Sequence, residues 1–226
     1  MNRSSTWITK AAAVFTKDLR CELRTRYSLT TLAMFAFTTL VVVSFSVGQG
    51  GLSPRVQAAL FWIIVFFSAM SSLAGAFVKE EDTGTAQTLR LYASAPVVYA
   101  GKLLFNMLLL FLLSLLVTPL YIIFMNITQV NWAILAAVIA LGVVGLAGAT
   151  TIIGAIVAQA GVRGALLAVL SFPVLLPLLV LAINGTTAAF DMSGWTNAID
   201  SIRLLAAYGV IMITASSVLF EFIWNG

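Results

Sequence analysis

The densest charge in the sequence lies in the stretch FVKEEDTGTAQTLRLYASAP, Phe77 to Pro96. This stretch, the polar island, begins with Lys79, Glu80, Glu81 and Asp82 and lies between two long apolar runs. It holds three of the eight acidic residues of the chain. The sequence has no histidine, which removes the commonest metal ligand and the commonest general base. An enzyme is therefore a poor fit, and the charges need another purpose.

The sequence also lacks the residues for an intrachain disulfide and for a phosphate-binding loop. Cys21 is the only cysteine, so no intrachain disulfide can form, and we expect a reduced, inert thiol. No GxxxxGK[ST] phosphate loop occurs, because Gly101-Lys102 is followed by leucine and lacks the upstream glycine. If the protein uses ATP, another chain must bind it.

The composition places the chain in lipid. Hydrophobic residues make up 61% of it and charged residues 9%, whereas a soluble domain carries about 25% charged residues. Six apolar runs approach the roughly 20 residues that cross a bilayer. They cover residues 29–47, 56–78, 103–125, 132–158, 165–183 and 204–224. We predict an all-α membrane protein in which residues 1–226 form a single transmembrane domain.

The basic residues set the orientation. With the N-terminus inside, ten of the twelve basic residues are cytoplasmic and only Arg55 and Arg203 lie outside. Basic residues near span ends favour the cytoplasmic side, and six spans return the C-terminus there. The net charge of +4 is then explained by these flanks beside anionic lipid, so no nucleic-acid partner is expected.

Residues 5–26 have the pattern of an amphipathic helix. Apolar residues recur at spacings of three and four. They are Ile8, Ala12, Phe15, Leu19 and Leu23. Basic residues occupy the other side, which is typical of a helix that lies in the membrane interface. Two roles stay open: a simple anchor, or an elbow helix that also touches a cytoplasmic partner.

Prolines and glycines mark three of the spans. Pro119 in the third span, and Pro173 with Pro177 in the fifth, remove backbone hydrogen bonds that neighbouring groups must replace. We expect kinks at these positions. The fourth span carries a stripe of small residues that we interpret as a packing surface. Its glycines are Gly142, Gly145, Gly148 and Gly154.

The remaining connections are short except one. A tight cytoplasmic turn at Arg163 and Gly164 leads into the fifth span, and residues 184–203 are expected to form the longest outer loop. Asp200 and Arg203, three residues apart, could pair on a helix there. The spans hold no cluster of ionisable residues, which argues against a proton-driven transporter.

The polar island has room for about two helical turns between Thr85 and Ala93, and Pro96 should end them. Leu89 and Ala93 would line one side, and Arg90 another. So short a helix is not stable alone. We therefore expect it to lean on a partner surface.

The island resembles the loop between spans two and three of type-2 ABC exporter permeases. In those proteins a charged stretch, a glycine, a leucine-bearing short helix, a proline and a basic residue recur in this order. The matching residues are Glu80, Glu81, Asp82, Gly84, Leu89, Pro96 and Lys102. The resemblance implies a type-2 permease fold with six spans, an interfacial N-terminal helix and a cytoplasmic coupling helix. That helix, with Arg90 included, would fit a groove in a dimeric ATP-binding subunit.

A second stretch narrows the family. Residues Gly161 to Val180, GVRGALLAVLSFPVLLPLLV, resemble the fifth span of haem exporter protein B (CcmB), a permease of cytochrome c maturation systems. In that family a glycine-flanked basic turn precedes two prolines four residues apart. Arg163, Gly164, Pro173 and Pro177 occupy those places here.

The resemblance implies a non-catalytic subunit of a bacterial inner-membrane complex. Its partners would be the ATP-binding subunit, haem-handling membrane subunits and, indirectly, a periplasmic haem chaperone. Without histidine this chain lacks the usual axial ligand, so we expect another subunit to hold haem and this chain to bind no cofactor directly. Met107 and Met125 are interpreted as packing residues. Two alternatives remain, a type-2 permease for a lipid, polysaccharide or drug, and a membrane scaffold without a transport role.

Overall fold

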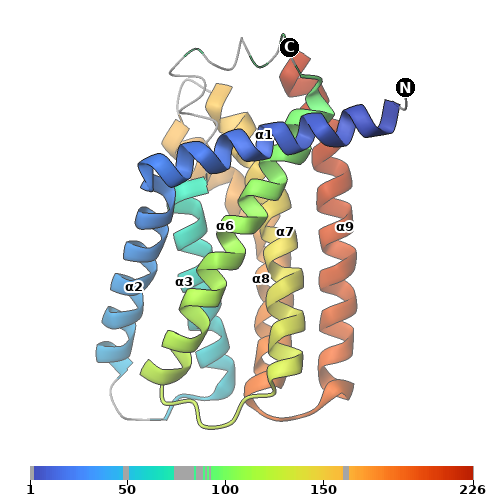
Figure 1. Cartoon of the computed structure of the whole chain (residues 1–226). Helices are drawn as coiled ribbons and strands as arrows, with labels where there is room; N and C mark the ends of the chain where they lie inside the picture. The colour runs from blue at the N-terminus through green and yellow to red at the C-terminus, as the bar shows by residue number, and fades with distance from the viewer. Residues whose placement is uncertain are drawn as a thin grey trace.

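The computed structural model of the chain describes residues 3–47, 51–73, 84, 89, 91, 93–159 and 163–225. Within these ranges all long elements are helices and no strand occurs, which confirms the all-α class. The helices are α1 (Arg3–Thr25), α2 (Tyr27–Val47), α3 (Pro54–Leu73), α6 (Ala95–Phe124), α7 (Trp132–Gln159), α8 (Arg163–Phe190) and α9 (Trp195–Asn225). Figure 1 shows α1 lying crosswise at one end of an upright bundle of the other six.

Five of these helices, α2 and α6 to α9, are long and apolar enough to cross a membrane. The predicted second span corresponds to α3, whose apolar part in the described residues, Pro54–Met70, is shorter. Its expected continuation to residue 78 lies outside the described residues. The six-span count therefore stays a prediction, while the lipid-embedded helical class agrees with the structure.

The predicted outer loop at 184–203 is wrong. α8 continues to Phe190 and α9 begins at Trp195, so only Asp191 to Gly194 connect them. Within α8 the Thr187 hydroxyl donates to the Ile183 carbonyl at 2.7 Å, so this polar side chain is satisfied by the helix itself. The predicted pair of Asp200 and Arg203 is confirmed, with 3.9 Å between carboxylate and guanidinium and both side chains exposed.

The helix α7 runs through the middle of the bundle and is the most enclosed of the five long apolar helices. Three of its glycines meet three different neighbours. A Cβ added to Gly142 would lie 2.2 Å from Trp62 of α3, and one on Gly145 would lie 2.6 Å from Leu178 of α8. At Gly148 the nearest atom, on Ile213 of α9, is 3.4 Å away. The interpretation of this stripe as a packing surface is confirmed.

The three prolines lie inside helices that continue past them, Pro119 in α6 and Pro173 with Pro177 in α8. The Tyr208 hydroxyl of α9 donates to the carbonyl of Val174, next to Pro173, at 2.6 Å. A side chain from a neighbouring helix thus supports the backbone of the proline-bearing stretch, as a lipid-embedded helix requires.

Replacing Tyr208 with phenylalanine should destabilise the bundle by about 1 kcal/mol, the usual contribution of one hydrogen bond. The ring would stay, so its packing against α7 is kept. The measurement is the unfolding midpoint of the protein in mild detergent. Tyr27→Phe, at an exposed ring near the start of α2, is the control and should leave the midpoint unchanged. Equal midpoints for both variants would argue against a supporting role of the Tyr208 hydroxyl.

The turn between α1 and α2 is sharp. Arg26 takes a left-handed φ of 53° between the two helices, which sends α2 down the bundle while α1 stays across its end. The buried carboxylate of Glu22 accepts a hydrogen bond from the backbone N–H of Leu29 at 2.8 Å. It satisfies one of the free donors in the first turn of α2. The backbone conformation of Arg26 and the hydrogen bond from Leu29 to Glu22 therefore fix the angle between α1 and α2.

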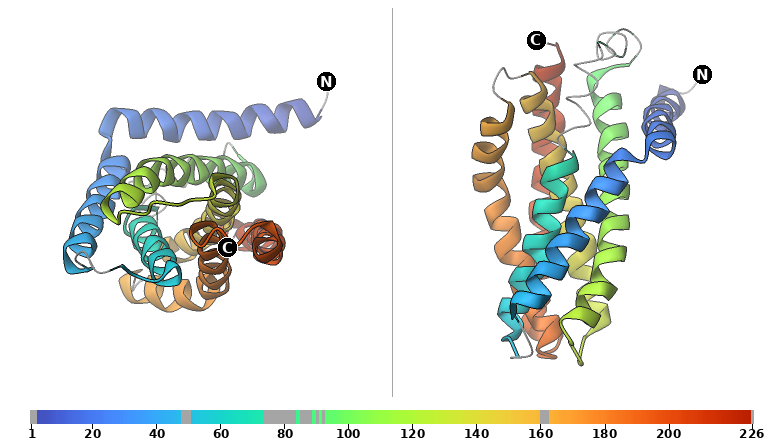
Figure 2. Two further views of the ribbon diagram at one scale, coloured as in Figure 1. Left: turned by 90° about the horizontal axis from the view of Figure 1, so that it is seen from below. Right: turned by 90° about the vertical axis from the view of Figure 1, so that its left-hand side faces the viewer.

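The predicted amphipathic helix is confirmed, but only part of its apolar set faces the protein, because Phe15 packs against the main core while others are exposed. Ile8 and Leu23 are exposed, at 63% and 58%. The buried side of α1 carries Ala11 and Val14 instead. The views in Figure 2 show α1 lying against α6 at the rim of the bundle, so one side meets protein and the others remain open. The helix thus has a protein-facing side that the apolar spacing did not identify.

Candidate functional site

The candidate site is the contact between α1 and the first turns of α6, which we call the elbow junction. Its core is a small cluster of Ala11, Val14 and Val97. Leu89 and Ala93, from the segment just before α6, pack against this cluster. The segment of the polar island closest to α6 therefore leans on α1 and α6 of its own chain.

The two helices approach closely because α6 has a glycine at the crossing. A Cβ added to Gly101 would lie 2.7 Å from the side chain of Val14 and 3.0 Å from the carbonyl of Ala11. Only a residue without a side chain fits there. Gly101 therefore sets the distance between α1 and α6.

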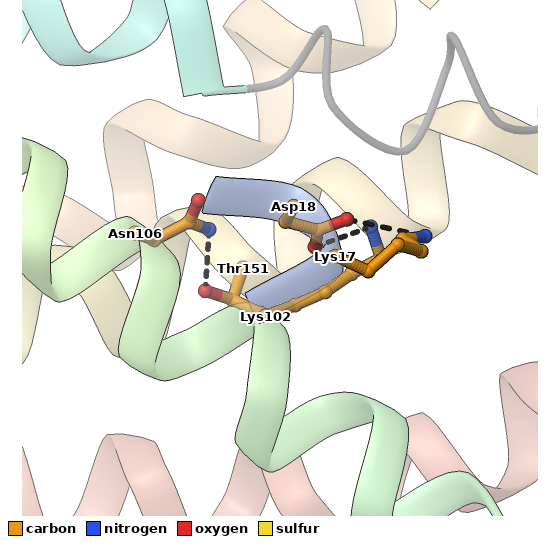
Figure 3. Close-up of polar contacts among 5 residues, drawn as sticks. All are labelled: Lys17, Asp18, Lys102, Asn106 and Thr151. Atoms are coloured by element: carbon orange, nitrogen blue, oxygen red, sulfur yellow. Dashed lines mark hydrogen bonds and ion pairs between the residues drawn. The ribbon is translucent and has the colours of Figure 1, made fainter. Parts of the chain in front are cut away.

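Next to this crossing lies a buried ion pair. The Lys102 ammonium is 3.4 Å from a carboxylate oxygen of Asp18, and the two side chains are 3% and 11% exposed. The other Asp18 oxygen is 3.1 Å from the more exposed Lys17 (Figure 3). A pair so far from water contributes little net stability, but losing one partner is costly. The pair thus fixes which residues of α1 and α6 meet.

One turn further along α6, Asn106 links this helix to α7. Its amide donates to the Thr151 hydroxyl at 2.8 Å (Figure 3). That hydroxyl in turn donates to the carbonyl of Ala147 at 2.6 Å. The amide oxygen of Asn106 is buried and has no hydrogen-bond partner among the described residues. Lys102 and Asn106 are four residues apart and therefore neighbours along one side of α6. Lys102 contacts α1 and Asn106 contacts α7, so these two residues connect α6 to both helices.

The structure covers part of the predicted coupling set. Glu80, Glu81, Asp82 and Arg90 lie outside the described residues. Gly84 has a φ of 68°, a conformation that glycine adopts without strain. Since most of the predicted coupling residues lie outside the described residues, the coupling role of the island stays a prediction.

The leucines of the island face different ways. Leu89 packs inward, and its carbonyl accepts a hydrogen bond from the N–H of Ala93 at 3.0 Å, as in a helical turn. Leu91 is 85% exposed. Sequence reasoning did not single out Leu91, although its position two residues from Leu89 places it on another side of a helix. The turn therefore offers an apolar side chain to the outside.

Pro96 occupies a different place from the one expected. The proline lies in the first turn of α6, after an extended Ser94 with φ −70° and ψ 153°. It therefore begins the next helix as well as ending the short turn, since its fixed φ suits a helix start and its missing N–H is not needed there. The third span correspondingly starts at Ala95 rather than at residue 103.

The predicted turn at Arg163 and Gly164 and the two prolines of the fifth span lie apart from the elbow junction. Arg163 and Gly164 begin α8, and Pro173 and Pro177 lie further along it. This helix packs against α3, α7 and α9. Among the described residues, the structure therefore does not bring these residues together with Leu89 and Ala93 of the island.

Metal chemistry has no support in the part of the chain that the structure describes. No group of three or more His, Cys, Asp or Glu side chains there could hold a metal ion. Cys21 is exposed on α1. What the elbow junction offers is a connected set of packed side chains that joins the island to α1, α6 and α7.

Comparison with known families gives one match. The family model described as "CcmB protein" matches residues 9–222, which is nearly the whole chain from the second turn of α1 to the last turns of α9. No curated protein matches the chain significantly.

Proposed function

The chain belongs to the CcmB family of ABC-transporter membrane subunits in cytochrome c maturation, and from this premise we propose a mechanical role for it. ATP hydrolysis on a separate, dimeric ATP-binding subunit would displace the island. The displacement would pass through the elbow junction to α6 and α7, and drive haem delivery or release of the haem-loaded periplasmic chaperone. The chain itself would perform no catalysis.

The observation that carries the proposal is that the island runs directly into α6 while leaning on α1. Leu89 and Ala93 pack on Ala11, Val14 and Val97, so a push on the turn reaches both helices. The Lys102–Asp18 pair and the Asn106–Thr151 hydrogen bond oppose sliding of α6 against its neighbours. A packed contact of this kind moves between two arrangements rather than bending gradually. Such behaviour suits a switch driven by ATP.

Haem would be the cargo of the complex and not a resident cofactor of this chain. The sequence offers no histidine for haem iron. Histidine-bearing membrane subunits would therefore hold the iron. If the purified chain alone bound haem with a histidine-like spectrum, this part of the proposal would be wrong.

We place the chain in the bacterial inner membrane with both termini in the cytoplasm. Two observations support this orientation. In Figure 1 the helix α1, the start of α6 and the end of α9 lie at one end of the bundle, and the sequence assigns ten of the twelve basic residues to the cytoplasmic side. The positive-inside rule favours this arrangement.

The family match favours cytochrome c maturation over a permease for another substrate. Affinity purification of the complex in mild detergent tests this choice. The ATP-binding subunit and the haem-handling subunits should both co-purify with this chain. Recovery of the ATP-binding subunit with none of the others would favour a permease of another kind.

The exposed Leu91 allows a direct test of coupling. Leu91→Glu should leave the unfolding midpoint unchanged, because the side chain is 85% exposed. It should weaken recovery of the ATP-binding subunit about tenfold, as loss of an apolar interface anchor costs more than about 1 kcal/mol. Leu91→Met keeps the apolar contact and is the matched control. Both variants are measured by co-purification and by the yield of mature cytochrome c.

The outcomes separate the candidate roles. A Leu91→Glu variant that assembles and matures cytochrome c at the wild-type level would contradict the coupling role of the turn. Normal recovery of the complex, together with unchanged ATP hydrolysis in Gly84, Leu89 and Glu81 variants, would favour a scaffold without a transport role.

A further inference from the structure

A buried hydroxyl without a partner lies beside the proline of α6. The Thr118 hydroxyl oxygen is buried and has no hydrogen-bond partner among the described residues. Several other buried hydroxyls donate to the carbonyl four residues before them, as Ser114 does to Leu110 at 2.8 Å. Further examples are Ser68, Thr151 and Ser171. Because an unpartnered buried hydroxyl destabilises the arrangement that contains it, its presence at Thr118 needs a physical reason.

The residue after Thr118 deprives a carbonyl of its usual donor. Pro119 has no N–H, so the Leu115 carbonyl lacks the bond that an α-helix forms from the residue four positions on. Leu115 is 64% exposed on a helix that is long and apolar enough to cross a membrane, and no water replaces the lost donor in lipid. A hydroxyl without an acceptor and a carbonyl without its usual donor thus lie within one turn of α6.

A hydroxyl can reach the carbonyl three residues before it. Elsewhere in this chain the Ser217 hydroxyl donates to the Thr214 carbonyl at 2.8 Å, which is the same spacing as Thr118 to Leu115. Threonine in a helix has two allowed χ1 rotamers, because its hydroxyl can bond a carbonyl of the preceding turn. Rotation of the Thr118 side chain therefore gives a second arrangement, in which its hydroxyl bonds the Leu115 carbonyl.

The two ends of α6 are fixed to different helices. Lys102 and Asn106 bind its first half to α1 and α7. In its last turns the buried Tyr121 hydroxyl donates to the Gln57 carbonyl of α3 at 2.7 Å. A movement of the first half relative to α3 must therefore be taken up between Asn106 and Tyr121. Pro119 lies in this interval, and a helix bends most readily where a proline interrupts its backbone bonds.

We propose that Thr118 and Pro119 form a two-position hinge, called here the α6 hinge. In the first position, the one described above, the Thr118 hydroxyl is unbonded. In the second position it donates to the Leu115 carbonyl, and the first half of α6 tilts with the elbow junction relative to α3. The new bond replaces the one that Pro119 removes and so stabilises the second position. The driving force rests on the proposed function, because ATP-driven displacement of the island would favour the second position.

A distance between α1 and α3 reports the tilt. Cys21, the only cysteine, is exposed on α1 and carries one spin label. Val56→Cys, at a 43% exposed position of α3, carries the other. Pulsed electron paramagnetic resonance measures the label-to-label distance in the full chain alone, and in the complex with and without a non-hydrolysable ATP analogue. We expect a second distance as a minor population in the chain alone, and a larger share of it in the complex with the analogue.

Variants of Thr118 assign the second distance to its hydroxyl. Thr118→Val keeps the shape and removes the donor, so the ratio of the second to the first distance should fall about fivefold, as for one hydrogen bond. The unfolding midpoint should not fall, because the hydroxyl is unbonded in the first position. Thr118→Ser keeps the donor and should keep the ratio. Ser114→Ala is the matched control, since that hydroxyl already bonds Leu110, and should leave the ratio unchanged.

Pro119→Ala tests the partner of the hydroxyl. The alanine N–H can bond the Leu115 carbonyl, which then no longer needs Thr118. Adding Thr118→Val to Pro119→Ala should therefore leave the ratio of the two distances where Pro119→Ala alone puts it. Such non-additivity is the measure of a direct interaction between two neighbouring groups.

The outcomes separate the hinge from the proposed function. A single distance in every sample, or a wild-type ratio in Thr118→Val, would overturn the α6 hinge. An equal effect of Thr118→Val with and without Pro119→Ala would also overturn it, because the hydroxyl would then act on another group than the Leu115 carbonyl. If the ratio depends on Thr118 in the chain alone but the ATP analogue leaves it unchanged in the complex, the hinge holds and the ATP-driven role is wrong.

Discussion

Replacing Asp18 with leucine should lower the free energy of unfolding by about 3 kcal/mol, the usual cost of removing one partner of a buried ion pair. The Lys102 ammonium, whose side chain is 3% exposed, would lose the carboxylate that lies 3.4 Å away. The single change Lys102→Met should cost less, because Asp18 would still pair with Lys17 at 3.1 Å. The measurement is the unfolding midpoint in detergent at fixed lipid content.

The double variant Asp18→Leu with Lys102→Met decides the cause. Exchanging a whole buried pair for apolar side chains is often neutral or stabilising, so the double variant should recover most of the lost stability. Lys17→Met, at a half-exposed site, is the control and should change little. If the double variant were as unstable as Asp18→Leu alone, the pairing of Asp18 with Lys102 would not explain the loss.

An equally large effect is expected at the centre of the bundle, where Gly142→Ala should destabilise the chain by about 3 kcal/mol through overpacking. The new Cβ would lie 2.2 Å from the ring of Trp62. That ring has little freedom to move, because it is 1% exposed and its N–H donates to the buried Thr186 hydroxyl at 2.8 Å. Expression yield of monodisperse protein and the unfolding midpoint in detergent report the loss.

Two companion variants test the clash itself. Gly148→Ala, on the same helix, meets its nearest atom at 3.4 Å and should be tolerated. Adding Trp62→Phe to Gly142→Ala removes the outer ring that causes the conflict and should restore part of the stability, although Thr186 loses its donor. Equal loss at Gly142 and Gly148 would point to helix propensity rather than to contact with Trp62.

Much of the architecture could be predicted from the residues. Long apolar runs with few charges can only be satisfied in lipid as helices, since every backbone group must be bonded within the segment. The amphipathic spacing of residues 5–26 likewise predicts α1, and the small residues of α7 predict close packing. These features depend on local composition and period, which the sequence displays directly.

Element boundaries and directions were harder to predict. Residues 184–190 contain asparagine, glycine and threonines, which are typical of loops, yet they continue α8. A Cβ added to Gly185 would lie 2.7 Å from Val138, so the helix packs closely on α7 there, and the Thr186 hydroxyl accepts a hydrogen bond from the Trp62 ring. The apolar spacing of α1 indicated a face toward the membrane interface, and Ile8 and Leu23 are exposed, but the buried contact through Ala11 and Val14 was not predicted. In a membrane protein apolar side chains can face lipid as well as the core, so hydrophobicity alone does not distinguish the two.

The sequence by itself thus determined the lipid environment, the helical class, the amphipathic N-terminal helix and the family, because apolar length, charge distribution and short motifs are properties of the chain. Only the tertiary structure decided what the polar residues do. Asp18 and Lys102 form one ion pair although they are 84 residues apart in the sequence. Asn106 of α6 likewise bonds Thr151 of α7. Such partners are chosen by which helix faces meet, and that choice depends on the packing of glycines and aromatic rings throughout the bundle.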